Sequence, residues 1–220
     1  MHSVFRSENI MSELTLWAAP ISPTGPLHSP PGAPPDWLSG PEKAEWATFV
    51  TRKRADEYRT GRSLLRRALA ERRYPLSSVV VTRDRYGVPI IEGVCEPPSF
   101  SICHCGGFAH HWWALVLVGP PALRIGMDAE PLSTRLSPAV LRYMAAPEER
   151  EALQQAGPFS WLRAWVLKEC VQKALGLGMH LKPWLIDTRR LPIRIAQHSI
   201  DVRVRCQWGL LIAAGILRPL

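Results

Sequence analysis

The segment IGMDAEP at residues 125–131 is an apolar run that contains two acids, Asp128 and Glu130, and ends at a proline. In a β-strand, residues two apart point to the same face, so Asp128 and Glu130 would project side by side with Cβ atoms roughly 6–7 Å apart. Two carboxylates at that spacing repel each other unless a cation lies between them, and hard oxygen ligands suit Mg²⁺. The alternative is a strand end whose two carboxylates are simply hydrated.

The segment WVLKECVQK at residues 165–173 has the pattern of a helix. Trp165, Glu169 and Lys173 follow one another at four-residue steps and therefore share one helical face. Taken alone, Glu169 and Lys173 are explained by a surface ion pair worth about 0.3–0.5 kcal/mol. If this helix meets the acidic strand, three carboxylates hold a metal, and Lys168 and Lys173 hold a polyanion bound to that metal. That layout is typical of a site that moves or cleaves a phosphate ester.

The composition is that of a globular protein with a basic surface. The chain has 220 residues, of which 46% are hydrophobic, and this is enough for one large domain or two small ones. No apolar run approaches the roughly 18–20 residues that span a bilayer. The formal net charge of +8 favours an anionic partner, which could be nucleic acid, a phosphorylated small molecule or an acidic protein. A basic surface that serves only solubility is the remaining reading.

The five cysteines form no recognisable disulfide framework. Cys103 and Cys105 flank His104, but no second Cys/His pair follows at a zinc-like spacing. Reduced thiols in a cytoplasmic protein are the simpler interpretation.

The order of expected elements indicates an α+β fold made of two similar halves. Prolines crowd residues 20–35, so we expect an N-terminal arm over 1–40 and the fold proper to begin near Asp36. Helices are expected from Pro41 and over 56–73, followed by strands at 77–82, 99–104, 112–118 and 123–129. Helices then recur at 138–145, 147–155 and 159–175, followed by strands at 191–196, 200–206 and 208–216. The halves would be 41–120 and 121–220.

Three segments of the chain resemble a known family. FSICHCG at 100–106, IGMDAE at 125–130 and WVLKECVQKALGLG at 165–178 are similar to the F-x-I-S-H-x-G, I-G-x-D-x-E and W-x-x-K-E-x-x-x-K segments of 4′-phosphopantetheinyl transferases of the surfactin-synthetase-activating type. Their order and spacing match, and GRSLLR at 61–66, YGVP at 86–89 and PEER at 147–150 fall where that family has further segments. The resemblance runs from about residue 40 to residue 215.

The resemblance implies a monomer of two α+β halves with coenzyme A in the cleft between them. Such an enzyme, a holo-acyl-carrier-protein synthase, moves 4′-phosphopantetheine from coenzyme A to a serine of an apo acyl or peptidyl carrier protein, with Mg²⁺, and releases adenosine 3′,5′-bisphosphate. It implies neither a nucleic-acid nor a membrane partner.

The resemblance also implies roles for single residues. Asp128, Glu130 and Glu169 would bind Mg²⁺, Glu169 would take the serine proton, and Asp128, Glu169 and Lys173 form the catalytic set. The expected contacts with coenzyme A come from Arg66, Cys103, His104, Lys168 and Lys173. Trp165 would shape the site, and Glu148 falls in a segment sometimes tied to catalysis.

The sequence departs from the family pattern at two positions. Val88 replaces the lysine of a G-K-P segment, where Arg83 or Arg85 could compensate, and Cys103 replaces a serine and so loses a good hydroxyl hydrogen bond. A nonenzymatic relative that binds coenzyme A or a carrier is one alternative, although the intact acids and Lys173 argue against it. A nucleic-acid-binding module is another, and it would need aromatic platforms among its basic residues.

The expected acidic carrier protein would meet basic residues near the second half's helices. Arg142, Arg150 and Arg163 are the candidates for this docking face.

Overall fold

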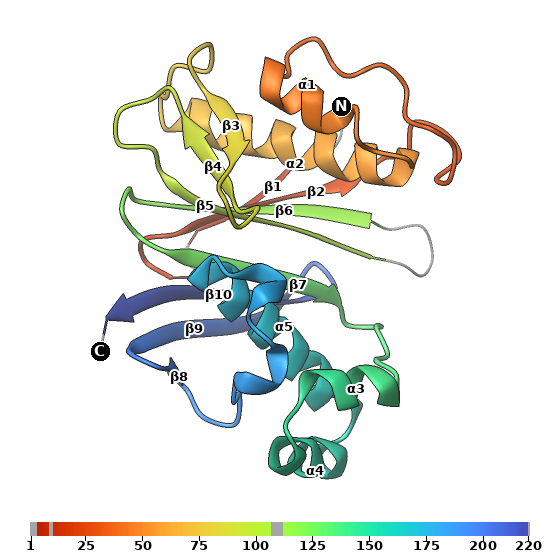
Figure 1. The fold of residues 1–220 in the computed structure, drawn as a ribbon, viewed down its shortest axis with the longest axis vertical. Coiled ribbons are helices and arrows are strands. Elements are labelled where there is room, and N and C mark those ends of the chain that lie inside the picture. The colour runs from red at the N-terminus through yellow and green to blue at the C-terminus, as the bar shows by residue number, and fades with distance from the viewer. Residues whose placement is uncertain (1–3, 9–10, 107–111, 220) are drawn as a thin grey trace.

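The first sheet lies under a long helix in the computed structural model, which describes residues 4–8, 11–106 and 112–219. Its strands are β1 (Phe5–Glu8), β2 (Thr15–Ile21), β6 (Trp112–Gly119) and β5 (Ser99–Cys105), all antiparallel and in that spatial order. Helix α2 (Arg52–Glu71) covers one face, where Leu65 and Leu69 pack on Trp17 and Val116. Figure 1 shows α2 and the β3–β4 hairpin on the same side of this sheet.

The second sheet repeats this plan with different residues. Its strands are β7 (Ile125–Pro131), β10 (Leu210–Pro219), β9 (His198–Gln207) and β8 (Ile193–Ile195), again antiparallel and in that order. Helix α5 (Pro158–Leu175) packs on one face of this sheet through Val166, Leu167 and Val171.

The two halves share one topology. The order strand, long helix, hairpin holds for β2–α2–β5–β6 and for β7–α5–β9–β10, and in both the last strand lies between the other two. The fold is α+β, as predicted. Descent from a duplicated unit stays a prediction.

A single apolar core joins the two sheets. Leu16 and Leu115 from the first sheet and Met127 and Ile212 from the second belong to the same buried cluster. The backbone N–H of Met127 also donates to Oγ of Ser101 at 3.1 Å across the junction. The sheets therefore pack face to face (Figure 1), and their edge strands β5 and β7 come together there.

The expected N-terminal arm over 1–40 is wrong for residues 15–21. These residues pair with β6 from Thr15 opposite Val118 to Ile21 opposite Trp112, and Leu16 and Trp17 are buried on opposite faces. Pro20 lies beyond the described pairing with β1, which runs from Thr15 to Ala18, so among the described residues its missing N–H breaks no ladder on that side. We propose a first half that includes β1 and β2 and a division from the second half between β6 and β7.

The smaller elements complete the two halves. They are α1 (Gly40–Trp46), the hairpin of β3 (Val80–Arg83) and β4 (Pro89–Glu92), α3 (Pro138–Met144), α4 (Pro147–Ala156), and the short 3-10 helices η1 (Gly178–His180) and η2 (Pro183–Leu185). The three expected helices between 138 and 175 are confirmed to within about a residue, each beginning at a proline. Helix α2 begins at Arg52 rather than at residue 56, because Thr51 caps it. In the described part of the chain, no helix is long and apolar enough to cross a membrane.

Gly126 sets how closely α5 lies on β7. A Cβ atom at this position would fall inside the contact radius of the Cys170 carbonyl oxygen and the Ala174 nitrogen, which are backbone atoms of α5. The thiol of Cys170 donates to the carbonyl oxygen of Gly126 at 3.3 Å. Only glycine allows this direct approach, and it brings the face of α5 that carries Glu169 and Lys173 beside the acids of β7.

Candidate active site

One cavity of about 370 Å³ brings the three sequence segments together. Strands β5 and β7 and helices α2 and α5 contribute its walls. Its lining residues are Arg54, Glu57, Ile102, Cys103, His104, Asp128, Glu130, Trp165, Glu169 and Lys173. The acidic strand and the lysine-bearing helix therefore meet. From the sequence alone, this contact could be named only as the condition for a shared site.

Lys173 and Asp128 form the central ion pair of this cavity. Nζ of Lys173 donates to Oδ1 of Asp128 at 2.7 Å. Burial is the largest single influence and alone would lower the pKa of Lys173, but the anionic groups around it, Asp128 first among them, together outweigh burial and the pKa rises, so the lysine stays charged. Burial raises the pKa of Asp128, and the ammonium of Lys173 opposes this rise.

The three carboxylates repel one another within the cavity. Burial, followed by the charge of Asp128, raises the pKa of Glu130 to about 7. The same two causes, in the same order, raise the pKa of Glu169. Acids that raise each other's pKa share a volume in which a cation would be stabilised.

The donor set fits a divalent cation, although no ligating cluster is assembled. All three acids offer hard oxygen ligands of the kind Mg²⁺ prefers. Among the described residues, however, no group of three or more His, Cys, Asp or Glu side chains lies close enough together to hold a metal. One oxygen of Asp128 is engaged by Lys173 instead.

His104 lies at the wall of the cavity with a free ring nitrogen. Its Nε2 is buried and has no hydrogen-bond partner among the residues that the structure describes. Burial, aided by the charge of Arg54, lowers the pKa of His104 to about 3, so the ring is neutral near pH 7. Gly61 of α2 makes room for it, because a Cβ there would lie 2.8 Å from Nε2. Cys103 is also a neutral group, since burial raises the pKa of its thiol.

A second, basic cavity of about 150 Å³ adjoins the first. The two share Arg54, Ile102 and His104, and the second adds Arg62 and Arg83. Arg54 and Arg62 were not among the residues that the sequence analysis expected at the site. The available signal was Gly61, a glycine in the middle of a strong helix, which often marks a close approach by another element.

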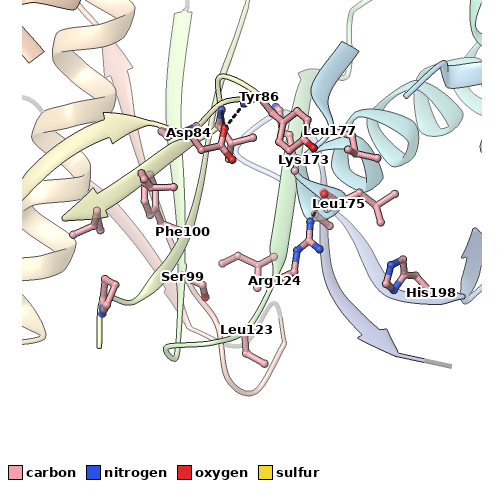
Figure 2. A pocket seen from close by; sticks show the side chains of 18 of the residues that line it. Asp84, Tyr86, Ser99, Phe100, Leu123, Arg124, Lys173, Leu175, Leu177 and His198 are labelled. Carbon is pink, nitrogen blue, oxygen red and sulfur yellow. Dashed lines mark hydrogen bonds between the residues drawn. The ribbon is translucent and has the colours of Figure 1, made fainter. Parts of the chain in front are cut away.

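A cleft of about 710 Å³ lies between the halves (Figure 2). Its walls are the β3–β4 hairpin, the start of β5, the start of β7, the end of α5 and the turn from β8 to β9. Tyr86, Phe100, Leu123 and Leu177 make it largely apolar, and Lys173 lines both this cleft and the carboxylate cavity. Val88 lines it too, which places the departure from the G-K-P pattern at this cleft.

Two of the residues expected to contact coenzyme A lie elsewhere. Arg66 pairs with Glu42 at 3.1 Å and donates to the carbonyl oxygen of Leu76 at 3.3 Å, and it lines none of these three cavities. Lys168 is completely buried, and its ammonium donates to Glu149 and to two backbone carbonyls. Both expectations are corrected because neither side chain faces the site. An ammonium with three protein acceptors has no donor left for a ligand.

The segments around PEER also differ from expectation. Glu148 is exposed, whereas Glu149 is buried against Lys168. Arg150 donates to the carbonyl oxygens of Arg142 and Ala145 at the end of α3, so its role is to cap that helix rather than to dock a partner.

The two arginines that could compensate for Val88 have different surroundings. Arg83 pairs with Glu45 of α1, donates to the carbonyl oxygen of Gly87 at 2.6 Å and lines the basic cavity. Arg85 lies over the ring of Tyr86 at 4.7 Å and lines none of the three cavities. Arg83 is therefore the better placed of the two.

Comparison with known proteins adds one finding. No curated protein sequence matches the chain. Residues 124–205 match the model of the 4′-phosphopantetheinyl transferase superfamily. The matched range contains β7, α3, α4, α5 and β8, and with them Asp128, Glu130, Glu169 and Lys173. The segment that holds these four residues is therefore similar to the 4′-phosphopantetheinyl transferase superfamily, and a transferase of the phosphopantetheine group is the activity that this similarity indicates.

Proposed function

We propose that the protein is a transferase of the surfactin-synthetase-activating type, which moves 4′-phosphopantetheine from coenzyme A to a serine of an apo acyl or peptidyl carrier protein. The observation that carries the proposal is the cavity in which Asp128, Glu130 and Glu169 surround Lys173 beside a basic cavity and an apolar cleft. The superfamily match over residues 124–205 supports the same chemistry.

In the proposed reaction, Glu169 takes the proton of the carrier serine. A serine hydroxyl is a weak nucleophile without a base beside it, and the raised pKa of Glu169 brings its carboxylate closer to the basicity that such a step requires. The serine oxygen attacks the phosphorus that bears the pantetheine arm, and the bond from that phosphorus to the neighbouring diphosphate oxygen breaks. Adenosine 3′,5′-bisphosphate leaves with the negative charge.

Lys173 neutralises charge in this step. Its ammonium is held charged by Asp128 and lines both the carboxylate cavity and the cleft, so it can reach a diphosphate lying between them. Mg²⁺ held by Asp128, Glu130 and Glu169 would, when bound, offset the remaining charge on the diphosphate oxygens.

We propose that coenzyme A lies across the three adjoining cavities. The neutral His104 would hydrogen-bond to coenzyme A through Nε2, and Arg54, Arg62 and Arg83 would supply positive charge for its phosphates. The apolar cleft suits the flat adenine ring, which Tyr86 and Phe100 can flank. This arrangement explains the basic character of the chain without a nucleic-acid partner. We also propose that the protein acts as a cytoplasmic monomer.

The decisive experiment is mass spectrometry of purified apo-carrier proteins after incubation with the protein, coenzyme A and Mg²⁺. A mass gain equal to one phosphopantetheine on the carrier serine is expected, with loss of the gain in excess EDTA and recovery on adding Mg²⁺. Full transfer in EDTA would remove the metal from the proposal.

Substitutions in the cavity separate this function from its alternatives. Asp128→Ala and Glu169→Ala should abolish transfer while the fold is kept, and Glu151→Ala, which removes an exposed carboxylate of α4 outside the cavity, should not. A nonenzymatic relative would bind coenzyme A but modify no carrier in any of these proteins. A nucleic-acid-binding module would instead show binding to DNA or RNA that collapses with rising salt.

A further inference from the structure

A buried ion pair behind the candidate site ties together segments that the proposed chemistry does not use. Lys168 has no exposed surface, and Nζ lies 2.6 Å from Oε2 of Glu149, which is itself almost completely buried. The same ammonium donates to the carbonyl oxygens of Pro183 and Ile186. All three of its donors are therefore used within the protein.

The carboxylate of Glu149 is satisfied on its other side by Thr188. Oε1 accepts the backbone N–H of Thr188 at 2.9 Å and its hydroxyl at 2.7 Å. Glu149 also lies in the first turn of α4, where the backbone N–H groups favour a negative charge. We call the set of Glu149, Lys168 and Thr188 the tether. It joins α4, α5 and the segment 183–188.

The tether fixes the rotation of α5 about its axis. Lys168 and Glu169 are neighbours in sequence, so their side chains leave the helix about 100° apart. When Lys168 is held by three acceptors on one flank, Glu169 and Lys173 are directed to the carboxylate cavity on the other. Gly126 holds the backbone of the same helix against β7. Contact at one side and a tether at another leave the helix little freedom to roll.

We infer that the tether is a positioning device for the catalytic face of α5, and that Lys168 acts through Glu169 and Lys173 rather than on the substrate. This inference rests on the proposed function for its kinetic readout. It assigns to Lys168 and Glu149 a role that neither the superfamily match nor the cavity reveals. The consequence is that loosening the tether lowers the turnover number and leaves the affinity for coenzyme A unchanged.

The test uses a paired substitution that removes both buried charges. Lys168→Met alone leaves Glu149 buried and uncompensated, so this variant can fail to fold. Lys168→Met/Glu149→Gln avoids that problem, because the amide oxygen of the glutamine can still accept from Thr188 and methionine fills a similar volume. Thr188→Val removes one hydrogen bond only. Lys182→Met, at an exposed lysine beside the same segment, is the matched control.

We expect the double variant to keep a cooperative thermal transition and the wild-type dissociation constant for coenzyme A, while kcat falls about tenfold or more. Thr188→Val should lower kcat by a smaller factor, and Lys182→Met should leave it unchanged. Amide hydrogen exchange at Thr188 should be faster in the double variant. Wild-type kcat in the folded double variant would overturn the inference, because the charges would then serve stability alone. A loss of coenzyme A affinity equal to the loss of kcat/KM would also overturn it, in favour of direct contact with the ligand.

Failure of the proposed function would be recognised separately. If the wild-type protein transfers nothing to any carrier, the proposed function fails. The amide hydrogen exchange rate of Thr188 still tests the tether, because it does not depend on activity. Faster exchange of Thr188 in the double variant would support a tether that holds the segment 183–188. Unchanged exchange would overturn it.

Discussion

Replacing Gly61 by alanine should separate the stability of the protein from its affinity for coenzyme A. The position lies in the middle of α2, where alanine favours the helix over glycine by about 1 kcal/mol. The new Cβ would lie 2.8 Å from Nε2 of His104 and 3.2 Å from a methyl group of Ile102. Both contacts are tips of side chains, so the strain can be relieved by turning the His104 ring and shifting Ile102, at a cost of about 1–3 kcal/mol.

The two effects on folding nearly cancel, whereas the effect on the ligand does not. We expect the free energy of unfolding to change by about 2 kcal/mol or less. Turning the ring takes Nε2 away from the place where we propose that it hydrogen-bonds to coenzyme A. One neutral hydrogen bond contributes about 0.5–1.5 kcal/mol, so the dissociation constant for coenzyme A should rise roughly 2- to 12-fold.

Isothermal titration calorimetry with coenzyme A and thermal unfolding measure the two quantities on the same sample. Gly40→Ala is the matched control, because a Cβ there meets nothing within 4 Å and the residue is far from His104 in the sequence. Wild-type affinity in Gly61→Ala would refute the role given to His104. A large loss of stability would refute the claim that the neighbouring side chains can yield.

Further predictions concern other parts of the site. His104 is buried and neutral, with its pKa lowered to about 3, whereas the unfolded chain takes up a proton at this ring below pH about 6.5. Stability should therefore fall as the pH drops from about 6.5 towards 3, and His104→Gln should show a weaker fall in thermal unfolding across that window. Val88→Lys places a cation on the wall of the interhalf cleft and should tighten coenzyme A binding by roughly 1.5–3 kcal/mol at best, as measured by calorimetry; no change would mean that Arg83 already serves. Charge reversal of Arg142 and Arg163 should raise KM for the apo-carrier, more so at low salt, without weakening coenzyme A binding; an unchanged carrier KM would place the docking face elsewhere.

The second half of the fold follows closely from its sequence, and the first half less so. Proline at the first turn of α3, α4 and α5 and glycine after α5 are strong local signals, and they located these helices to within about a residue. Strand β2 gave no such signal. It is buried on both faces, so its apolar residues do not alternate with polar ones as they would in a half-exposed strand. The proline-rich segment that follows it led to the expectation that all of residues 1–40 form an arm.

The candidate site divides in the same way. Asp128, Glu130, Glu169 and Lys173 could be identified because spacing within one strand and within one helix determines which side chains share a face. That the strand and the helix meet depends on Gly126, whose role appears only in three dimensions. The expected contact of Lys168 with coenzyme A is wrong for a related reason. A lysine is rarely buried, and no local sequence pattern indicates that its partner is Glu149, nineteen positions away. Arg66 was likewise assigned to the ligand although Glu42, twenty-four positions earlier, engages it.

The common core between the two sheets limits how this protein can move. Leu16 and Leu117 on one side and Met127 and Ile216 on the other belong to one buried cluster, so separating the halves would expose that cluster to water. Exposing apolar surface costs about 25 cal/mol per Å², and a hinge that opened the halves would pay this cost at every turnover. Entry and exit of a ligand must therefore rely on the rim of the cleft, such as the β3–β4 hairpin, while the two sheets behave as one rigid block. For the same reason, neither half should fold when it is produced alone, and denaturant should unfold both in a single transition.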